Sequence, residues 1–324
     1  MNTAALFDRR ILIVAGKGGT GRTTVAAALA RAAVRAGKRV LLAQTNAPPR
    51  LAHLLGYPEG IGSEIVAVGE RLWAVNMNQR AALREYLLKV LRYDTLYRAL
   101  FENRAVRSFL GAFPGLDAWA MLGKAWWHTT EQEGGRQKYD LLVLDGPAAG
   151  HIVTMLRAPG AVQAAMPRGL LARPAAAAIA LLSDPARAAL LIVTLAEELA
   201  ARETVALAHL VRESLQIPLG PLIVNALPPV TAGQTELRSV LQRTAEQPVD
   251  PALRATLAGA SILVARRCDA ERIMDNLSRD PGLPMIRLPR MPTNDLGPAE
   301  VEHLSRLLEL EQPSDSAPAG SLAR

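Results

Sequence analysis

A glycine-rich loop between an apolar run and a helical pattern constrains this chain more than any other feature. The loop reads GKGGTGRTT over residues 16–24. It follows the apolar run Ile11–Ala15, and an Ala- and Leu-rich helical pattern extends from Val25 to Ala36. This order predicts a strand, a tight loop and a helix. In such a unit the loop N–H groups and the helix N-terminus converge on one place, where they favour a bound polyphosphate.

The loop follows the nucleotide-binding pattern G-x-x-x-x-G-K-[ST] with one change, because Arg22 stands at the lysine position. A guanidinium grips phosphate as a planar fork, but it is bulkier than the ammonium of lysine. The loop also has an additional lysine, Lys17, near its start. The pattern predicts that phosphate is bound by Gly16, Gly18, Gly19, Thr20, Gly21, Arg22, Thr23 and Thr24.

The same glycines allow a second interpretation, since Gly16, Gly18 and Gly21 also satisfy the dinucleotide pattern G-x-G-x-x-G. That pattern requires an acid about 20 residues further on, at the end of the next strand, to bind the ribose. Here no Asp or Glu occurs between Asp8 and Glu59. An acid-free segment that carries Lys and Arg suits a polyanion, and we therefore favour the phosphate-binding loop.

The composition limits the classes of protein to which the chain can belong. A length of 324 residues with 50% apolar content supports one large domain or two small ones. The single cysteine, Cys268, excludes a disulfide framework and a metal centre built from the cysteines of one chain. The N-terminus lacks the apolar run of a signal peptide, and charges and prolines interrupt Leu171–Leu195. These features predict a cytoplasmic protein without a membrane span.

The net charge of +7 raises the question of a nucleic-acid partner. The basic residues are spread along the chain without a run of five, and aromatic residues make up only 4% of it. Base stacking needs aromatic platforms, which are scarce here. The charge is better explained as an Arg-rich solvated surface, and the sequence argues against nucleic acid as the partner.

Apolar runs that alternate with helical patterns predict an α/β fold with a mostly parallel sheet flanked by helices. We expect one domain over residues 1–311, with helical subdomain inserts at about 76–135 and 152–189, followed by a disordered tail at 312–324. Beyond the first strand–helix–strand unit at 9–46, the predicted strands are Tyr139–Asp145, Leu190–Leu195, Leu219–Val224, Ile262–Ala265 and Met285–Leu288, and the later predicted helices are Leu199–Leu215 and Pro298–Leu310.

Asp145 closes one of these apolar strands and precedes a glycine turn. An enzyme with a phosphate-binding loop needs an acid in this place to hold Mg²⁺ or its water shell. Thr23 would offer a hydroxyl ligand to the same ion. The alternative, that Asp145 only caps a helix or forms a turn, fits its position at the end of a buried strand less well.

The loop and the segment DGPAAGH at 145–151 together resemble the deviant Walker A P-loop ATPases. They are most similar to the ArsA family of arsenite-pump ATPases, which includes ATPases that target tail-anchored membrane proteins. The second switch of that family reads D-T-A-P-T-G-H, and Asp145, Gly150 and His151 match it in register. The resemblance implies an ATPase that uses ATP and Mg²⁺, with Asn225 at the position that contacts adenine.

The resemblance also implies partners. In this family the early lysine reaches across a dimer interface to the phosphates of the facing chain, which implies a catalytic role for Lys17. With one P-loop per chain, the dimer would be a homodimer or a heterodimer with a paralogous ATPase subunit. Nucleotide state would control the binding of a client protein. Cys268 alone supplies neither the C-x-x-C zinc pair of the targeting ATPases nor a metalloid site.

Two departures from the family pattern keep two alternatives open. The family has an Asp in its first switch, D-P-A-H, which positions or activates the attacking water, and Asn46 stands there in this chain. An amide orients a water but does not act as a base. With Arg22 as the second departure, the chain is either an active nucleotide-switch ATPase or a degenerate, weakly hydrolysing subunit that serves a more active paralogue.

Related ATPases of other types fit the sequence less well. A membrane-positioning type ends in a basic amphipathic helix, whereas the last predicted helix here contains Glu300, Glu302 and Glu309. A DNA-partitioning type remains open on charge, but His151 after the switch glycine favours the ArsA type. The nitrogenase-reductase branch needs two cluster cysteines per chain, which Cys268 alone does not provide.

Overall fold

The computed structural model describes residues 3–78, 116–165, 171–229 and 250–310, together with residues 82, 85, 167–168, 239–240 and 242. The predicted tail at 312–324 lies outside the described residues, and so does most of the first predicted helical insert, namely residues 79–115 apart from 82 and 85. The single domain that we expect over residues 1–311 stays a prediction.

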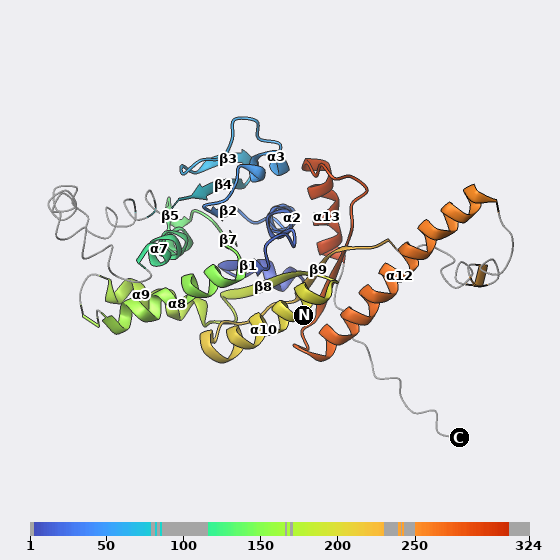
Figure 1. Cartoon of the computed structure of the whole chain (residues 1–324). Coiled ribbons are helices and arrows are strands. Elements are labelled where there is room, and N and C mark those ends of the chain that lie inside the picture. Colours follow the sequence, from blue (N-terminus) through green and yellow to red (C-terminus); the bar gives the residue numbers. More distant parts are fainter. Residues whose placement is uncertain are drawn as a thin grey trace, which may run out of the picture.

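One sheet organises the described part of the chain, and its strands follow the order β10-β9-β8-β1-β7-β2-β4-β3 (Figure 1). All neighbouring strands in it are parallel except β3 and β4, which form an antiparallel edge. The strands are β1 Ile11–Gly16, β2 Val40–Thr45, β3 Val66–Gly69, β4 Leu72–Met77, β7 Leu141–Asp145, β8 Ala188–Leu195, β9 Leu222–Leu227 and β10 Met285–Pro289.

Helices cover both faces of this sheet (Figure 1). One face packs against α1 Thr3–Phe7, α2 Arg22–Arg35, α3 Arg50–Leu55 and α13 Pro298–Leu310. The other packs against α7 Leu116–Thr130, α8 Ala149–Ala165, α9 Ala172–Leu182, α10 Glu198–Leu210 and the last turns of α12 Pro251–Arg279. A short π-helix at Val211–Leu215 extends α10, and β5 Gln132–Glu133 pairs with β6 Arg136–Gln137 in a small hairpin.

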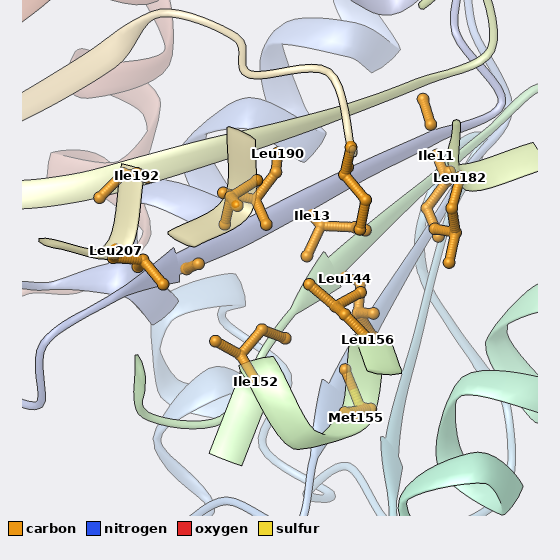
Figure 2. Packing of buried hydrophobic residues seen from close by; sticks show 14 of the residues in the cluster. Ile11, Ile13, Leu144, Ile152, Met155, Leu156, Leu182, Leu190, Ile192 and Leu207 are labelled. Atoms are coloured by element: carbon orange, nitrogen blue, oxygen red, sulfur yellow. The ribbon is translucent and has the colours of Figure 1, made fainter. Parts of the chain in front are cut away.

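The central strands are apolar on both sides because both of their faces are buried. Successive side chains of a strand point to opposite faces, so Ile11 and Ile13 join one core and Leu12 and Val14 join the other. Figure 2 shows Ile13, Leu144 and Leu190 side by side on three neighbouring strands, with Ile152 of α8 nearby. The glycine loop at the end of β1 is therefore supported by a core on each face.

The predicted fold class is confirmed, since the sheet is mostly parallel and helices flank it. The predicted strand at Ile262–Ala265 is wrong, because these residues lie within the 29-residue helix α12. A short apolar run does not distinguish a strand from a helix by its periodicity, and the Ala- and Arg-rich residues around this run favour the helix.

The predicted helical insert at 76–135 is also too long at both ends, because residues 76–77 belong to β4 and residues 132–133 form β5. The sequence prediction missed β3 and β4. Their residues add a strand pair next to β2, and β4 supports the chain where it leaves β2. Within the described residues, no helix has the length and apolar character that crossing a bilayer requires.

The two-sided core gives a testable difference between two leucines. Leu190 in β8 is completely buried, whereas Leu199 in α10 is 61% exposed. We expect Leu190→Ala to lower the free energy of unfolding by about 2–5 kcal/mol, because it leaves a cavity between sheet and helices. Leu199→Ala should change it by less than about 0.5 kcal/mol. Urea denaturation of both variants measures this, and equal losses would contradict the burial described here.

Candidate functional site

The glycine loop joins the end of β1 to the start of α2. Gly16, Gly19 and Gly21 adopt φ angles of 148°, 87° and 87°, a region that side chains rarely occupy. A Cβ atom on Gly16 would lie 2.2 Å from the carbonyl oxygen of Val193 in β8. Thr20 is buried, and its hydroxyl donates to the carbonyl oxygen of Lys17 at 3.0 Å. The loop is thus a tight turn that β8 and Thr20 hold in place.

Asn225 of β9 contacts the loop directly. Its side-chain amide donates to the carbonyl oxygen of Thr20 at 2.9 Å. A Cβ atom on Gly21 would lie 2.3 Å from the same amide nitrogen, so only glycine fits at this position. Asn225 therefore braces the loop and also lines the cavity beside it. The predicted contact of Asn225 with adenine remains a proposal.

Thr23 and Asp145, predicted to serve one metal ion, lie in contact. The Thr23 hydroxyl donates to Asp145 Oδ2 at 2.7 Å, which joins the first turn of α2 to the end of β7. The amide Nε2 of Gln44 donates to the same oxygen at 3.1 Å. The sequence prediction missed Gln44. The sequence did contain a sign of it, because Gln44 is a polar residue that interrupts the apolar run of β2 two positions before Asn46.

Asp145 is only 3% exposed. Burial raises the pKa of its carboxyl group, because removal from water disfavours the charged form. The hydrogen bonds from Thr23 and Gln44 and the charge of Arg22 act in the opposite direction and lower that pKa. Burial is the largest of these influences, so the acid is kept at a free-energy cost.

Arg22 points at the turn that follows Asp145. Its guanidinium donates to the carbonyl oxygen of Gly146 and is partly buried. Burial lowers the pKa of Arg22, and the nearby Asp145 opposes that shift. The side chain at the lysine position of the loop is therefore held at the switch segment, and it also lines the cavity.

Lys17 does not line the cavity. Its Nζ forms an ion pair with Oε1 of Glu203 in α10 at 3.0 Å, and the two side chains are 29% and 43% exposed. An ion pair this exposed contributes little stability. The ammonium of Lys17 is thus partly exposed and is held at α10 by a weak ion pair.

Asn46 follows β2 and is exposed, with a φ angle of 44°. Its backbone N–H donates to the carbonyl oxygen of Met77 at 2.7 Å. The next residue, Ala47, exchanges two hydrogen bonds with the side chain of Asn76. The end of β4 therefore holds this segment, and Asn46 does not line the cavity.

A cavity of about 1140 Å³ opens beside the loop at the carboxyl ends of the strands. This edge is where ligands bind in open α/β sheets. The loop contributes Gly19, Thr20, Gly21, Arg22, Thr23 and Thr24, and the ends of β8 and β9 contribute Leu195 and Asn225. Helix α12 contributes Leu263, Ala270 and Ile273 to the lining. The volume accommodates a nucleotide.

The cavity is rich in arginine. Besides Arg22, it is lined by Arg50, Arg266, Arg272 and Arg290, against the three acids Glu197, Glu198 and Asp269. Arg272 pairs with Asp269 at 3.4 Å and approaches Glu198 at 4.0 Å. The excess of positive charge favours a polyanionic ligand. Sequence reasoning missed these arginines, because they come from α3, α12 and the end of β10.

The predicted site residues are therefore in three places. Gly19, Thr20, Gly21, Arg22, Thr23, Thr24 and Asn225 line the cavity, as listed above, and Asp145 lies beneath Thr23. Gly16 anchors the loop to β8. Gly18, Lys17 and Asn46 do not line the cavity; Lys17 is partly exposed and Asn46 is exposed.

Comparison with known proteins agrees with this geometry. Residues 9–174 match the anion-transporting ATPase family, the ArsA ATPases. The ATPase BagA of Mycobacterium tuberculosis is 31% identical over 222 residues, which cover 67% of this chain and 64% of that protein. A putative arsenical pump-driving ATPase of Halobacterium salinarum is 26% identical over 70% of this chain and 37% of its own length. The ATPase GET3 of Lachancea thermotolerans is 26% identical over 46% of this chain and 44% of its own length.

The sheet order and the loop between β1 and α2 define an α/β protein of the P-loop nucleotide-binding class. The family match covers residues 9–174, and the mycobacterial ATPase is 31% identical over 67% of this chain. The chain therefore belongs to the ArsA ATPase family. The match spans less than two thirds of that relative's length.

The buried carboxyl of Asp145 predicts an unusual dependence of stability on pH. A carboxyl whose pKa is raised by folding contributes stability below its ordinary pKa, and that contribution is lost as pH rises through the folded-state value. We expect Asp145→Asn to gain stability relative to the unchanged chain as the pH is raised from about 4.5 to 8. Urea denaturation at several pH values measures the difference.

Asp140 provides the control with the opposite sign. Hydrogen bonds from Arg39 hold the pKa of Asp140 below its ordinary value, although burial opposes them. The charged carboxylate of Asp140 therefore adds to the free energy of unfolding above its ordinary pKa, and this stabilisation is lost as the pH falls. We expect Asp140→Asn to be less stable than the unchanged chain at neutral pH. If Asp145→Asn instead lost stability relative to the unchanged chain as the pH rises, the assignment would be contradicted.

Proposed function

We propose that this chain is an ATP-binding, dimeric nucleotide-switch ATPase of the ArsA type, which couples ATP binding and hydrolysis to the binding of a partner protein. The observation that carries the proposal is the hydrogen bond from Thr23, which lines an arginine-rich cavity beside the glycine loop, to the buried Asp145. A hydroxyl and an acid in this position are what a magnesium nucleotide requires.

The phosphates of ATP would lie on the N–H groups of the loop and at the N-terminus of α2. Arg22 would add charge, and Asn225 and the apolar residues of β8 and α12 would contact the base. Thr23 and Asp145 would hold Mg²⁺, directly or through its water shell. When bound, Mg²⁺ neutralises charge that develops on the transferred phosphoryl group.

We propose a dimer for two reasons: the position of Lys17, and the resemblance to a family in which this lysine reaches the phosphates of a facing chain. Lys17 does not line the cavity of its own chain, and among the described residues its ion pair is with the half-exposed Glu203, so we infer that it is available to the phosphates of a facing chain. Asn46 is accessible at the same edge and would orient the attacking water through its amide. Both groups would then act in the assembled site.

The second predicted helical insert, residues 152–189, contains α8 and α9, and it is one candidate for the surface that binds a client protein. On α8, Met155 is buried in the core. The exposed large apolar side chains on helices of the described part include Leu199 on α10 and Leu253, Ile262 and Leu263 on α12. These two helices are therefore the better candidates for contact with a protein partner.

A second candidate function is supported by Arg22 and Asn46. Arg22 is engaged with Gly146, and Asn46 lacks the charge that a base needs. In this case the chain binds nucleotide, barely hydrolyses it and donates Lys17 to an active paralogue in a heterodimer. Dependence of ATP turnover on protein concentration separates the two functions.

The first measurement is ATP turnover per chain over a wide range of protein concentration. We expect turnover to rise with concentration, because each site would be completed by Lys17 of the facing chain. Lys17→Ala should lower turnover at least about tenfold, as loss of a charge that stabilises the transition state does.

Lys38→Ala is the matched control. Lys38 is also 29% exposed and also pairs with one acid, Asp8, but it lies at the start of β2, away from the loop. It should leave turnover unchanged. The proposed function fails if the purified chain binds neither Mg-ATP nor Mg-ADP in calorimetry.

The degenerate alternative predicts low turnover at every concentration while nucleotide still binds. In that case the double variant Arg22→Lys with Asn46→Asp should raise turnover about tenfold or more, since it restores a phosphate-binding lysine and an acid near the water. No gain from the double variant, with folding checked by circular dichroism, counts against this alternative.

A further inference from the structure

Gln44 is a polar residue buried in an otherwise apolar strand. It is 1% exposed and lies in β2 between β4 and β7. In the parallel register it is paired with Asp145 on one side and with Asn76 on the other. Gln44 and Asp145 therefore lie next to each other beneath the first turn of α2.

The amide of Gln44 holds one oxygen of Asp145. Its Nε2 donates to Oδ2 at 3.1 Å, and the hydroxyl of Thr23 donates to the same Oδ2 at 2.7 Å. Two donors from different elements fix the plane of the carboxylate. Because Thr23 uses its one hydroxyl hydrogen in this bond, its lone pairs remain available to the cavity.

The other end of the amide has no partner. The atom Oε1 of Gln44 is buried and accepts no hydrogen bond in the described part of the chain. Burying an unpaired polar atom costs free energy, and an apolar side chain of similar length would avoid that cost. The fold therefore retains a glutamine whose evident interaction is the one with Asp145.

We propose that Gln44 is a positioning residue, which holds the Asp145 carboxylate in the orientation in which Asp145 and Thr23 receive the magnesium ion of a bound nucleotide. This inference rests on the proposed function, because it assumes a magnesium nucleotide at the loop. Partners that orient a metal ligand typically change metal affinity by about 10–100-fold when they are removed.

The test compares nucleotide affinity with and without magnesium. The substitution Gln44→Met keeps length and burial but removes the donor. A fluorescent ADP analogue is titrated into the purified full chain, once with Mg²⁺ and once with EDTA. In the unchanged chain Mg²⁺ should tighten binding, and in Gln44→Met we expect that Mg²⁺-dependent gain to fall about tenfold. The affinity in EDTA should stay within about twofold, because the loop contacts persist.

A buried hydroxyl elsewhere in the sheet provides the control. Thr194 in β8 is fully buried, donates only to the carbonyl oxygen of Leu195 in the described contacts, and does not line the cavity. Thr194→Val should leave both affinities unchanged. Because Gln44→Met removes both the unpaired oxygen and one donor to Asp145, far-UV circular dichroism checks that the variant is folded before it is titrated.

The outcomes separate the two proposals. An unchanged Mg²⁺-dependent gain in Gln44→Met overturns the role of Gln44 alone, as does an equal weakening with Mg²⁺ and with EDTA. If the unchanged chain binds no nucleotide in either buffer, the proposed function and this inference both fail. If Gln44→Met does not fold, Gln44→Leu replaces it; if neither variant folds, Gln44 is needed for the fold and the inference is overturned.

Discussion

The hydrogen bond between Thr23 and Asp145 is the contact on which the rest of the site depends. It joins the first turn of α2 to the end of β7, two elements that are more than a hundred residues apart in the sequence. The glycine loop before α2 and the switch segment after β7 are thereby held at the same edge of the sheet.

This contact requires a buried acid, and the surroundings reduce its cost without removing it. Burial raises the pKa of Asp145, while Thr23, Gln44 and Arg22 counteract that shift. A core without the acid would be more stable. The two large apolar cores, one on each face of the sheet, offset that cost.

Several parts of the fold and of the candidate site could be predicted from patterns of neighbouring residues in the sequence. The strands of the central sheet are continuous apolar runs, and the loop and Asp145 are marked by residue types with a specific chemistry. The strand expected at Ile262–Ala265 failed because a run of four apolar residues has no periodicity of its own, and the surrounding helix α12 decided its conformation. The pair β3 and β4 was missed although it supports the segment around Asn46.

The sequence by itself determined the fold class, the glycine-rich loop between β1 and α2 and the acid at the end of β7, because each depends on residues that are neighbours in the chain. Only the tertiary structure decided which distant residues complete the site. It placed Gln44 against Asp145 through the register of β2 and β7, and Arg50, Arg266 and Arg290 around one cavity. These placements follow from strand order and helix packing, which bring together side chains that share no local pattern.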